Sequence, residues 1–335
     1  MVAMRDINIS LLILQNLLQH SRKVYEDFLL NSDTWCTNAK EDLVTKPGYF
    51  NREVLGKKGL SELLREKLDS CMNGKAFLCC RMGNTECTIL GQYLEKCCGY
   101  RKRYGDSIRE WFLKTSGFFS DDKDDADIDE YSRMMLNAMS LIDIFLVWHP
   151  CFMDVVANYL APQAVLAVNE ILDYDTNRIS WVSGLTGKKV LVVTSFAKSI
   201  QYQYERRDKL AKYPGALLPE FELKTYQMIQ TQCNHREGFN SWFDAYKKVE
   251  NDVLSIDFDV AIVGAGAYAF PLCAAIKRNG RSAIEACSHT PTLFGVIGKR
   301  YIEDDTLARC GTKAWIRPME ETPEYANEIE DACYW

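Results

Sequence analysis

The sequence predicts an α/β fold, with a mainly parallel sheet, helices on both faces, and a helical extension at the N-terminus. Four segments repeat the order of apolar strand, turn of small residues and, in most cases, helix. That alternation is typical of parallel strands joined by right-handed crossovers. The strands are almost continuously apolar, as expected where both faces of a sheet are covered. Ahead of them, residues 5–30 carry apolar side chains at helical spacing, which predicts the extension.

The first unit is the strand AFLCCRMG followed by the helix NTECTILGQYLEKC, where Asn84 or Thr85 can cap the helix. The other strands are KKVLVVTSF (188–196), FDVAIVGAGA (258–267) and SAIEACS (282–288), and the last runs into the loop HTPTLFG. Two further helices are predicted, one over 129–150 that enters the core and an amphipathic one over 239–254.

We divide the 335 residues into an N-terminal helix with its connector, 1–50, and a single α/β domain, 51–335. Length alone allows two domains, but α/β folds of this size often form one unit. The N-terminal helix can serve as a dimer contact or a membrane-surface attachment, although packing on the protein's own core is the commoner arrangement. Formation of a homo-oligomer therefore stays an open alternative.

The composition indicates a cytoplasmic protein. The 13 cysteines are odd in number and scattered, without a CxxC pair, which favours buried free thiols in a reducing compartment. The apolar run 9–18 is too short to cross a bilayer and has no cleavage site after it, so we expect neither a signal peptide nor a transmembrane segment. Attachment to the inner face of the membrane stays open. The net charge of -6 argues against nucleic acid as a partner.

Polar and small residues follow the predicted strands. If the strands are parallel, these turns share one edge of the sheet, which is where open α/β sheets bind ligands. Glycine turns at helix N-termini suit phosphate groups, and Arg81 can add a bidentate contact. Glu86 would repel an anion unless a metal bridges them or the carboxylate transfers a proton. The candidates for this site are Arg81, Gly83, Asn84, Glu86, Ser195, Ser199, Gly264, Gly266, Tyr268, Ser288 and His289.

Two other motifs have a structural alternative. GAGAYA (264–269), with Glu285 at the end of the next strand, is similar to a dinucleotide fingerprint, but its glycines can simply allow close packing of helix and strand. Asp127 and Asp129 form a DxD, as in metal-dependent sugar transferases. They lie in an acidic run before a helix, where carboxylates stabilise the helix dipole, and this role is the commoner one.

Several motifs together carry a family resemblance: RMGNTE, TSFAKSI, LLPEFELK, VGAGAYAFPL, LFGVIGKR and the terminal CYW. With them, the chain resembles the bacterial GT-D-type glycosyltransferases and related proteins of surface-polysaccharide loci. The likeness runs from about residue 50 to the C-terminus.

This resemblance implies a Rossmann-like domain of modified topology that uses a nucleotide-sugar donor. In the characterised branch, the turn after the first strand carries R-x-G-D-x-E, whose Asp and Glu bind a divalent metal (Mn²⁺ or Mg²⁺) and the donor diphosphate. Arg81, Gly83 and Glu86 match that pattern, and Asn84 stands at the Asp position. Asn can still coordinate through its carbonyl oxygen, so Asn84 and Glu86 are the implied metal ligands. The loop SHTPTLFG is a second departure, because relatives have a glycine-rich turn there.

We therefore expect a hexosyltransferase of surface-polysaccharide biosynthesis, moving a sugar from a nucleotide-sugar donor to a glycan or lipid-linked acceptor. Glu86 and His289 are the catalytic candidates, and the remaining candidates bind the donor. One alternative is an NAD-type oxidoreductase, based on GAGAYA and Glu285. Another is a non-catalytic sugar-nucleotide-binding protein, based on Asn84 and the altered His289 loop.

Overall fold

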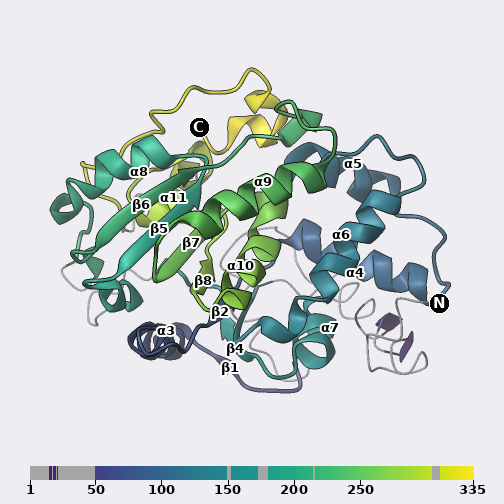
Figure 1. Cartoon of the computed structure of the whole chain (residues 1–335), viewed down its shortest axis with the longest axis horizontal. Helices are drawn as coiled ribbons and strands as arrows, with labels where there is room; N and C mark the ends of the chain where they lie inside the picture. The colour runs from purple at the N-terminus through teal and green to yellow at the C-terminus, as the bar shows by residue number, and fades with distance from the viewer. Residues whose placement is uncertain are drawn as a thin grey trace.

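A computed structural model describes residues 15–16, 18–19, 21, 50–148, 152–172, 180–213, 216–303 and 310–335 (Figure 1). The helix predicted over 5–30 lies almost entirely outside the described residues. The same is true of most of the connector up to residue 50.

Eight parallel strands form one sheet, which confirms the predicted α/β class (Figure 1). The four strands predicted from the sequence are consecutive neighbours in the order β2-β8-β7-β5, so their C-terminal ends do share one edge. Across the sheet the order is β1 (Val54–Leu55), β4 (Val165–Val168), β3 (Ile144–Val147), β2 (Leu78–Cys80), β8 (Ser282–Glu285), β7 (Val260–Gly264), β5 (Lys189–Thr194) and β6 (Glu222–Gln227).

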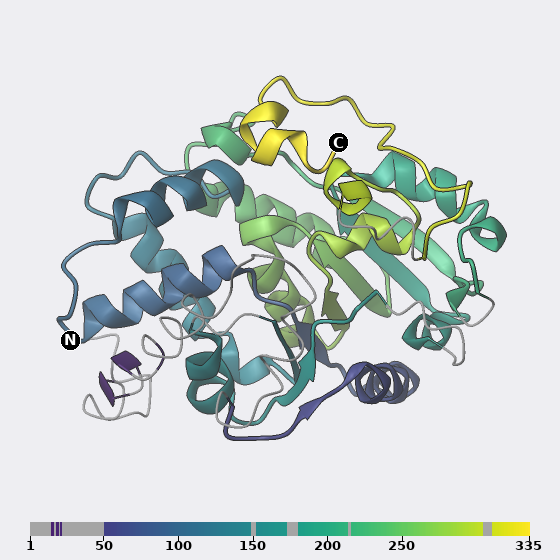
Figure 2. The same cartoon turned by 180° about the vertical axis from the view of Figure 1, so that it is seen from behind.

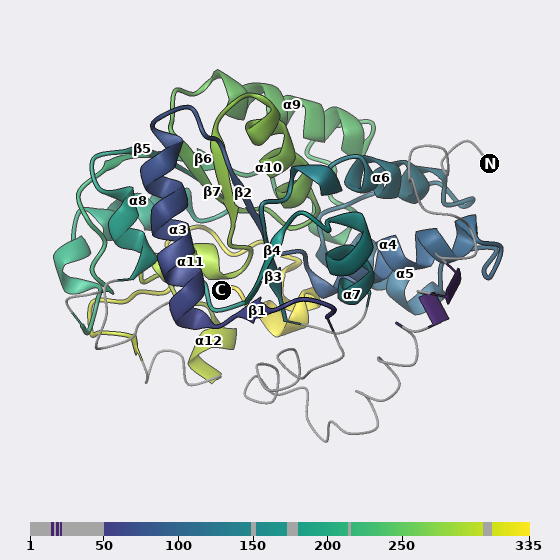
Figure 3. The same ribbon diagram turned by 90° about the horizontal axis from the view of Figure 1, so that it is seen from below.

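Helices cover both faces of the sheet, as predicted (Figures 1 and 3). Alternate residues of each strand enter two separate cores: Leu78 and Cys80 pack with α4, α6, α9 and α10, whereas Cys79 packs with α3, α8 and α11. The helices are α3 (Lys57–Cys71), α4 (Asn84–Cys97), α5 (Asp106–Thr115), α6 (Ala126–Leu136), α7 (Met153–Val155), α8 (Ala197–Tyr204), α9 (Trp242–Ser255), α10 (Ala269–Arg278), α11 (His289–Leu293) and α12 (Lys299–Glu303).

The single helix predicted over 129–150 is wrong in its second half. Helix α6 ends at Leu136, and Ile144–Val147 forms β3 between β2 and β4. All four β3 residues are buried, because helices cover the sheet on both faces. The prediction over 239–254 is confirmed by α9, whose N-cap Ser241 accepts a hydrogen bond from the backbone N–H of Asp244.

The cysteines within the described residues form no disulfide, but the prediction that they are buried holds only in part, because Cys71, Cys97, Cys98, Cys233 and Cys287 are partly exposed. In the same part of the chain, no helix combines the length and the apolar character that a bilayer-spanning segment requires.

Candidate ligand site at the C-terminal edge of the sheet

The topology reverses between β2 and β8. On one side β2 pairs with β3, the next strand in the sequence. On its other side β2 pairs with β8, the last strand in the sequence, and β8 also pairs with β7. In parallel sheets such a reversal leaves a crevice beyond the strand ends, where ligands bind. The turns after β2 and β8 carry six of the predicted site residues: Arg81, Gly83, Asn84, Glu86, Ser288 and His289.

A buried carboxylate ties the two strand ends together. Glu285, only 3% exposed, accepts hydrogen bonds from the backbone N–H of Arg81 (3.1 Å) and the thiol of Cys80 (3.0 Å). The thiol of Cys287 donates to the carbonyl of Arg81 at 3.1 Å. Burial raises the pKa of Glu285 to about 7. Glu285 therefore fixes the backbone at the start of the Arg81 turn.

The side chain of Arg81 packs over an aromatic ring. Its guanidinium carbon lies 4.3 Å from the centroid of Trp148, which directly follows β3. The indole N–H of Trp148 donates to the carbonyl of Met82 at 3.1 Å, which fixes the ring. The buried Nε of Arg81 has no hydrogen-bond partner among the described residues. The contact with Trp148 thus leaves one N–H donor of this cation unpaired within the described part of the chain.

Glu86 lies in the first turn of α4 and folds back over it. A Cβ on Gly83, the N-cap, would lie 1.9 Å from Glu86 Oε2, so a larger residue here would displace the Glu86 carboxylate. Burial raises the pKa of Glu86, opposed by a hydrogen bond from its own backbone N–H and by the charge of Arg81. Beside it, the buried Oδ1 of Asn84 has no partner among the described residues.

His289 opens α11, which follows β8. Its buried Nδ1 has no partner among the described residues, and its ring centroid lies 5.7 Å from that of Tyr301. The hydroxyl of Tyr301 donates to Ser288 Oγ at 2.7 Å. Burial, helped by the charges of Arg81 and Arg300, lowers the pKa of His289 to about 3. At neutral pH the imidazole is therefore uncharged and only weakly basic.

Arg300 and Tyr334, which no pattern along the chain singled out, lie next to these residues. The guanidinium carbon of Arg300 lies 5.0 Å from the ring centroid of Tyr334, and one of its N–H groups donates to the Tyr334 hydroxyl at 3.4 Å. Both belong to motifs that carried the resemblance, LFGVIGKR and CYW. Neither follows a strand, so position along the chain did not point to them.

Ser195 directly follows β5 and Ser199 lies in the first turn of α8, where the C-terminal segment covers the edge of the sheet (Figure 2). The backbone N–H of Ser199 donates to Glu320 Oε1 at 2.9 Å, and its hydroxyl donates to the other oxygen of the same carboxylate. Trp335 packs edge-on against Phe196 at 5.9 Å. A carboxylate of the chain itself thus occupies the anion position at the start of α8.

Gly264, Gly266 and Tyr268 are packed against the protein. The backbone N–H of Ala267 donates to the carbonyl of Ser116 at 2.8 Å, and a Cβ on Gly266 would lie 2.3 Å from that carbonyl oxygen. A Cβ on Gly264 would lie 2.5 Å from the carbonyl oxygen of Cys287. Tyr268 is 2% exposed and hydrogen-bonds Thr231 at 2.9 Å. The glycines have a packing role, and their contact with a ligand stays a prediction.

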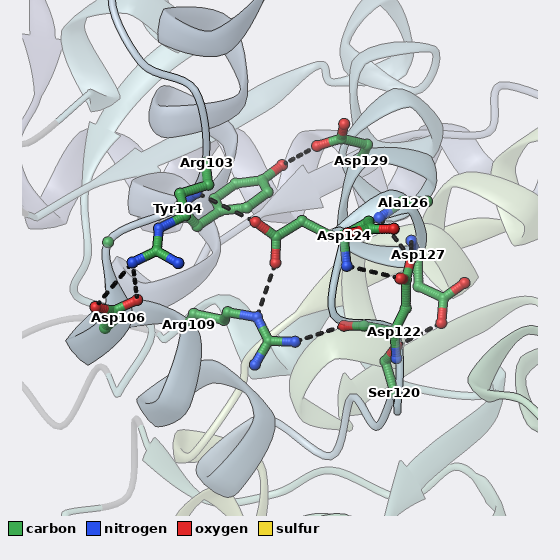
Figure 4. A network of polar contacts seen from close by, with 12 residues as sticks. Arg103, Tyr104, Asp106, Arg109, Ser120, Asp122, Asp124, Ala126, Asp127 and Asp129 are labelled. Carbon is green, nitrogen blue, oxygen red and sulfur yellow. Dashed lines mark hydrogen bonds and ion pairs between the residues drawn. The ribbon is translucent and has the colours of Figure 1, made fainter.

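The acidic run before α6 is a structural network (Figure 4). The carboxylate of Asp122 accepts from the backbone N–H groups of Ala126 and Asp127, at 2.7 and 3.3 Å, and so caps the helix. Asp127 accepts from Ser120, and Asp129 pairs with Lys96 at 2.6 Å. The helix-cap interpretation of this run is confirmed, and both carboxylates of the DxD are engaged.

The side chains at Asn84 and Glu86 do not fit a divalent cation as they lie. Mg²⁺ and similar ions require several oxygen ligands in open positions. The carboxylate of Glu86 is folded against Gly83 at the start of α4. The charge of Arg81 is close enough to oppose the rise in its pKa that burial causes. Glu285 accepts hydrogen bonds from Arg81 and Cys80. Among the described residues, no group of three His, Cys, Asp or Glu side chains could hold a metal ion. Metal binding by Asn84 and Glu86 stays a prediction.

Comparison of the chain with protein-family models, with curated proteins and with solved structures finds no match.

Proposed function

We propose that this chain is a glycosyltransferase that moves a hexose-type sugar from a nucleotide-sugar donor to a glycan or lipid-linked acceptor. One observation carries the proposal: Arg81 Nε, Asn84 Oδ1 and His289 Nδ1 are buried at the ends of β2 and β8 without a partner among the described residues. Leaving such groups unpaired costs about 1–3 kcal/mol each, and a polar ligand recovers that energy. Donors and an acceptor beside an aromatic ring suit a ligand with phosphate, hydroxyl and ring parts.

Arg81 would bind the diphosphate. Its guanidinium, stacked on Trp148, is oriented for a bidentate contact with phosphate oxygens. In transfer, the bond between the anomeric carbon and the diphosphate oxygen breaks while a bond to the acceptor hydroxyl oxygen forms. A fixed cation beside the departing diphosphate stabilises the charge that develops on it.

Glu86 is the candidate for the base that takes the acceptor proton. Burial raises its pKa, which makes its carboxylate a stronger base. His289, with its pKa lowered to about 3, is a weaker candidate for proton transfer. It would serve as a neutral hydrogen-bonding group. The reaction would take place in the cytoplasm, with a lipid-linked acceptor reached at the inner face of the membrane.

A non-catalytic sugar-nucleotide-binding protein is the second candidate. The observation that favours it is the position of Glu86, whose carboxylate folds against Gly83 and accepts a hydrogen bond from its own backbone N–H. A carboxylate held there caps the helix, as Glu often does in a first turn. In this candidate the site binds the donor without transferring the sugar.

The NAD-type alternative has less support from the contacts. It needs free amides at the glycine turn and an accessible acid at Glu285. The N–H of Ala267 is bonded to Ser116, and Glu285 is buried and bonded to Arg81.

A thermal-shift panel tests these candidates together. The full chain is titrated with UDP-, GDP- and CDP-sugars and with NAD and NADP, each with and without Mn²⁺, and release of the nucleoside diphosphate is then assayed. We expect a shift with one class of sugar nucleotide, followed by release. A shift without hydrolysis or transfer would favour the binding protein, and a shift with NAD alone would contradict the proposal.

A further inference from the structure

We propose that Arg300 and Tyr334 complete the ligand site, and that Arg81 and Arg300 together hold the ligand's diphosphate in place of a divalent metal. The inference rests on the proposed function, because it concerns the same nucleotide site. Because the oxygen atoms of Asn84 and Glu86 do not fit a divalent cation, other groups must supply the positive charge that binds the diphosphate.

A continuous set of contacts connects the two arginines. The carbonyl of Arg81 accepts from the thiol of Cys287 at 3.1 Å, and the next residue, Ser288, accepts from Tyr301 at 2.7 Å. Arg300 directly precedes Tyr301 in α12. His289 follows Ser288, and both guanidinium charges lower its pKa. The two guanidinium groups therefore lie close enough to influence the same residue, His289, after the end of β8.

The C-terminal residues lie against Arg300. The backbone N–H of Arg300 donates to the carbonyl of Cys333 at 3.0 Å, and a Cβ on Gly298 would lie 2.6 Å from that oxygen. Burial raises the pKa of Tyr334 to about 12, so its phenol is neutral and can donate a hydrogen bond. The buried Nε1 of Trp335 has no partner among the described residues. Tyr334 thus brings a hydrogen-bond donor next to Arg300, and Trp335 leaves an indole N–H unpaired among the described residues.

Arg300 already has an anionic partner that a ligand can replace. Its guanidinium pairs with Glu330, and both side chains are 35% exposed. Glu330, Asp331 and Ala332 all have positive φ angles, of 46°, 54° and 57°, a conformation that is unfavourable for residues other than glycine. A partly exposed pair of this kind is worth at most about 1 kcal/mol. A diphosphate, with more charge and two phosphate groups, displaces the carboxylate and bridges to Arg81.

The experiment measures nucleotide binding by calorimetry on the full chain, using UDP, GDP and CDP as probes in EDTA and again in Mn²⁺. We expect the preferred nucleotide to bind equally tightly in both buffers. Arg300→Ala should weaken binding by about 10- to 100-fold, and the conservative Tyr334→Phe by about three- to tenfold. Glu330→Gln should tighten binding by about two- to fivefold, because it removes the competing carboxylate. A purely structural role of Arg300 does not predict that gain.

Arg206→Ala is the matched control. Arg206 also lies over a tyrosine, with its guanidinium carbon 4.9 Å from the ring of Tyr202, but it follows the C-terminal end of α8. It should bind nucleotide like the wild type, and urea unfolding of every variant checks that the fold is kept. Binding that requires Mn²⁺, or wild-type affinity in Arg300→Ala, would overturn this inference and leave the proposed function standing. Absence of nucleotide binding in both buffers would overturn both.

Discussion

The guanidinium of Arg81 packs over the indole of Trp148, with 4.3 Å between the guanidinium carbon and the ring centroid. The two residues come from the ends of neighbouring strands, β2 and β3. Their stacking turns a flexible cation into an oriented one at the point where the sheet topology reverses. Ligand binding at this site should depend on the orientation of Arg81 as much as on its charge.

Replacement of Arg81 by lysine therefore tests orientation apart from charge. Arg81→Lys keeps the cation but loses the planar stack and the bidentate contact, so nucleotide binding should weaken about tenfold. Calorimetry measures the affinity, and urea unfolding checks that the fold is kept. A lysine variant that binds as tightly as the wild type would show that the stacked geometry has no role.

Substitution of the candidate base Glu86 should affect sugar transfer, whereas substitution in the acidic run should affect stability. Glu86→Gln should lower the rate of sugar transfer by about 10²- to 10⁴-fold while nucleotide binding persists, because only the proton acceptor is lost. Asp129→Asn removes the negative charge that pairs with Lys96 and accepts from Tyr104, and should instead lower the free energy of unfolding by about 1–2 kcal/mol, with transfer unchanged. Transfer assays and urea unfolding on both variants decide this, and the reverse pattern would move the metal or base role to the DxD.

The glycine turn after β7 should be sensitive for packing reasons. Gly266 has φ 52°, and a Cβ there meets the carbonyl of Ser116, so Gly266→Ala should destabilise the fold by about 2–5 kcal/mol. Gly280 also has a positive φ, 76°, but no atom lies within 4 Å of its Cβ position. Gly280→Ala should cost only about 1–2 kcal/mol. Equal losses for both variants in urea unfolding would contradict the packing role.

The buried Glu285 should make stability depend on pH. Burial raises its pKa from 4.5 to about 7, so the folded protein holds this proton more tightly than the unfolded chain does. The resulting stabilisation is fully present below pH 4.5 and is lost as the pH rises through about 7. Glu285→Gln cannot titrate. The unfolding free energy of the wild type relative to this variant should therefore fall by about 3 kcal/mol across that range, and a constant difference would contradict the account.

The sequence was informative where a residue's role follows from local pattern. Apolar runs ending in small residues predicted β2, β5, β7 and β8 and their common edge, because fully buried parallel strands have that composition. It was misleading where an apolar run fits both helix and strand, as at Ile144–Val147. β6 was not predicted, because at the edge of the sheet its residues ELKTYQ remain partly exposed and polar.

The site was predictable on one side only. Arg81, Glu86 and His289 follow strands, so topology placed them together. Arg300 and Tyr334 reach the same volume from α12 and the C-terminus, and no rule of spacing connects them to a strand end. The carbonyl of Ser116, distant in sequence, bonds Ala267 next to Gly266, a tertiary contact that a fingerprint motif cannot show.

Hydrogen–deuterium exchange with the sugar nucleotide that gives the largest thermal shift shows where the ligand binds. We expect slower exchange in peptides that cover 81–87 and 287–301, at the ends of β2 and β8. The Ala267 amide in the turn 264–269 should change little, because it is already bonded to Ser116. Protection confined to 264–269, with 81–87 and 287–301 exchanging as in the free protein, would contradict a ligand site at the ends of β2 and β8.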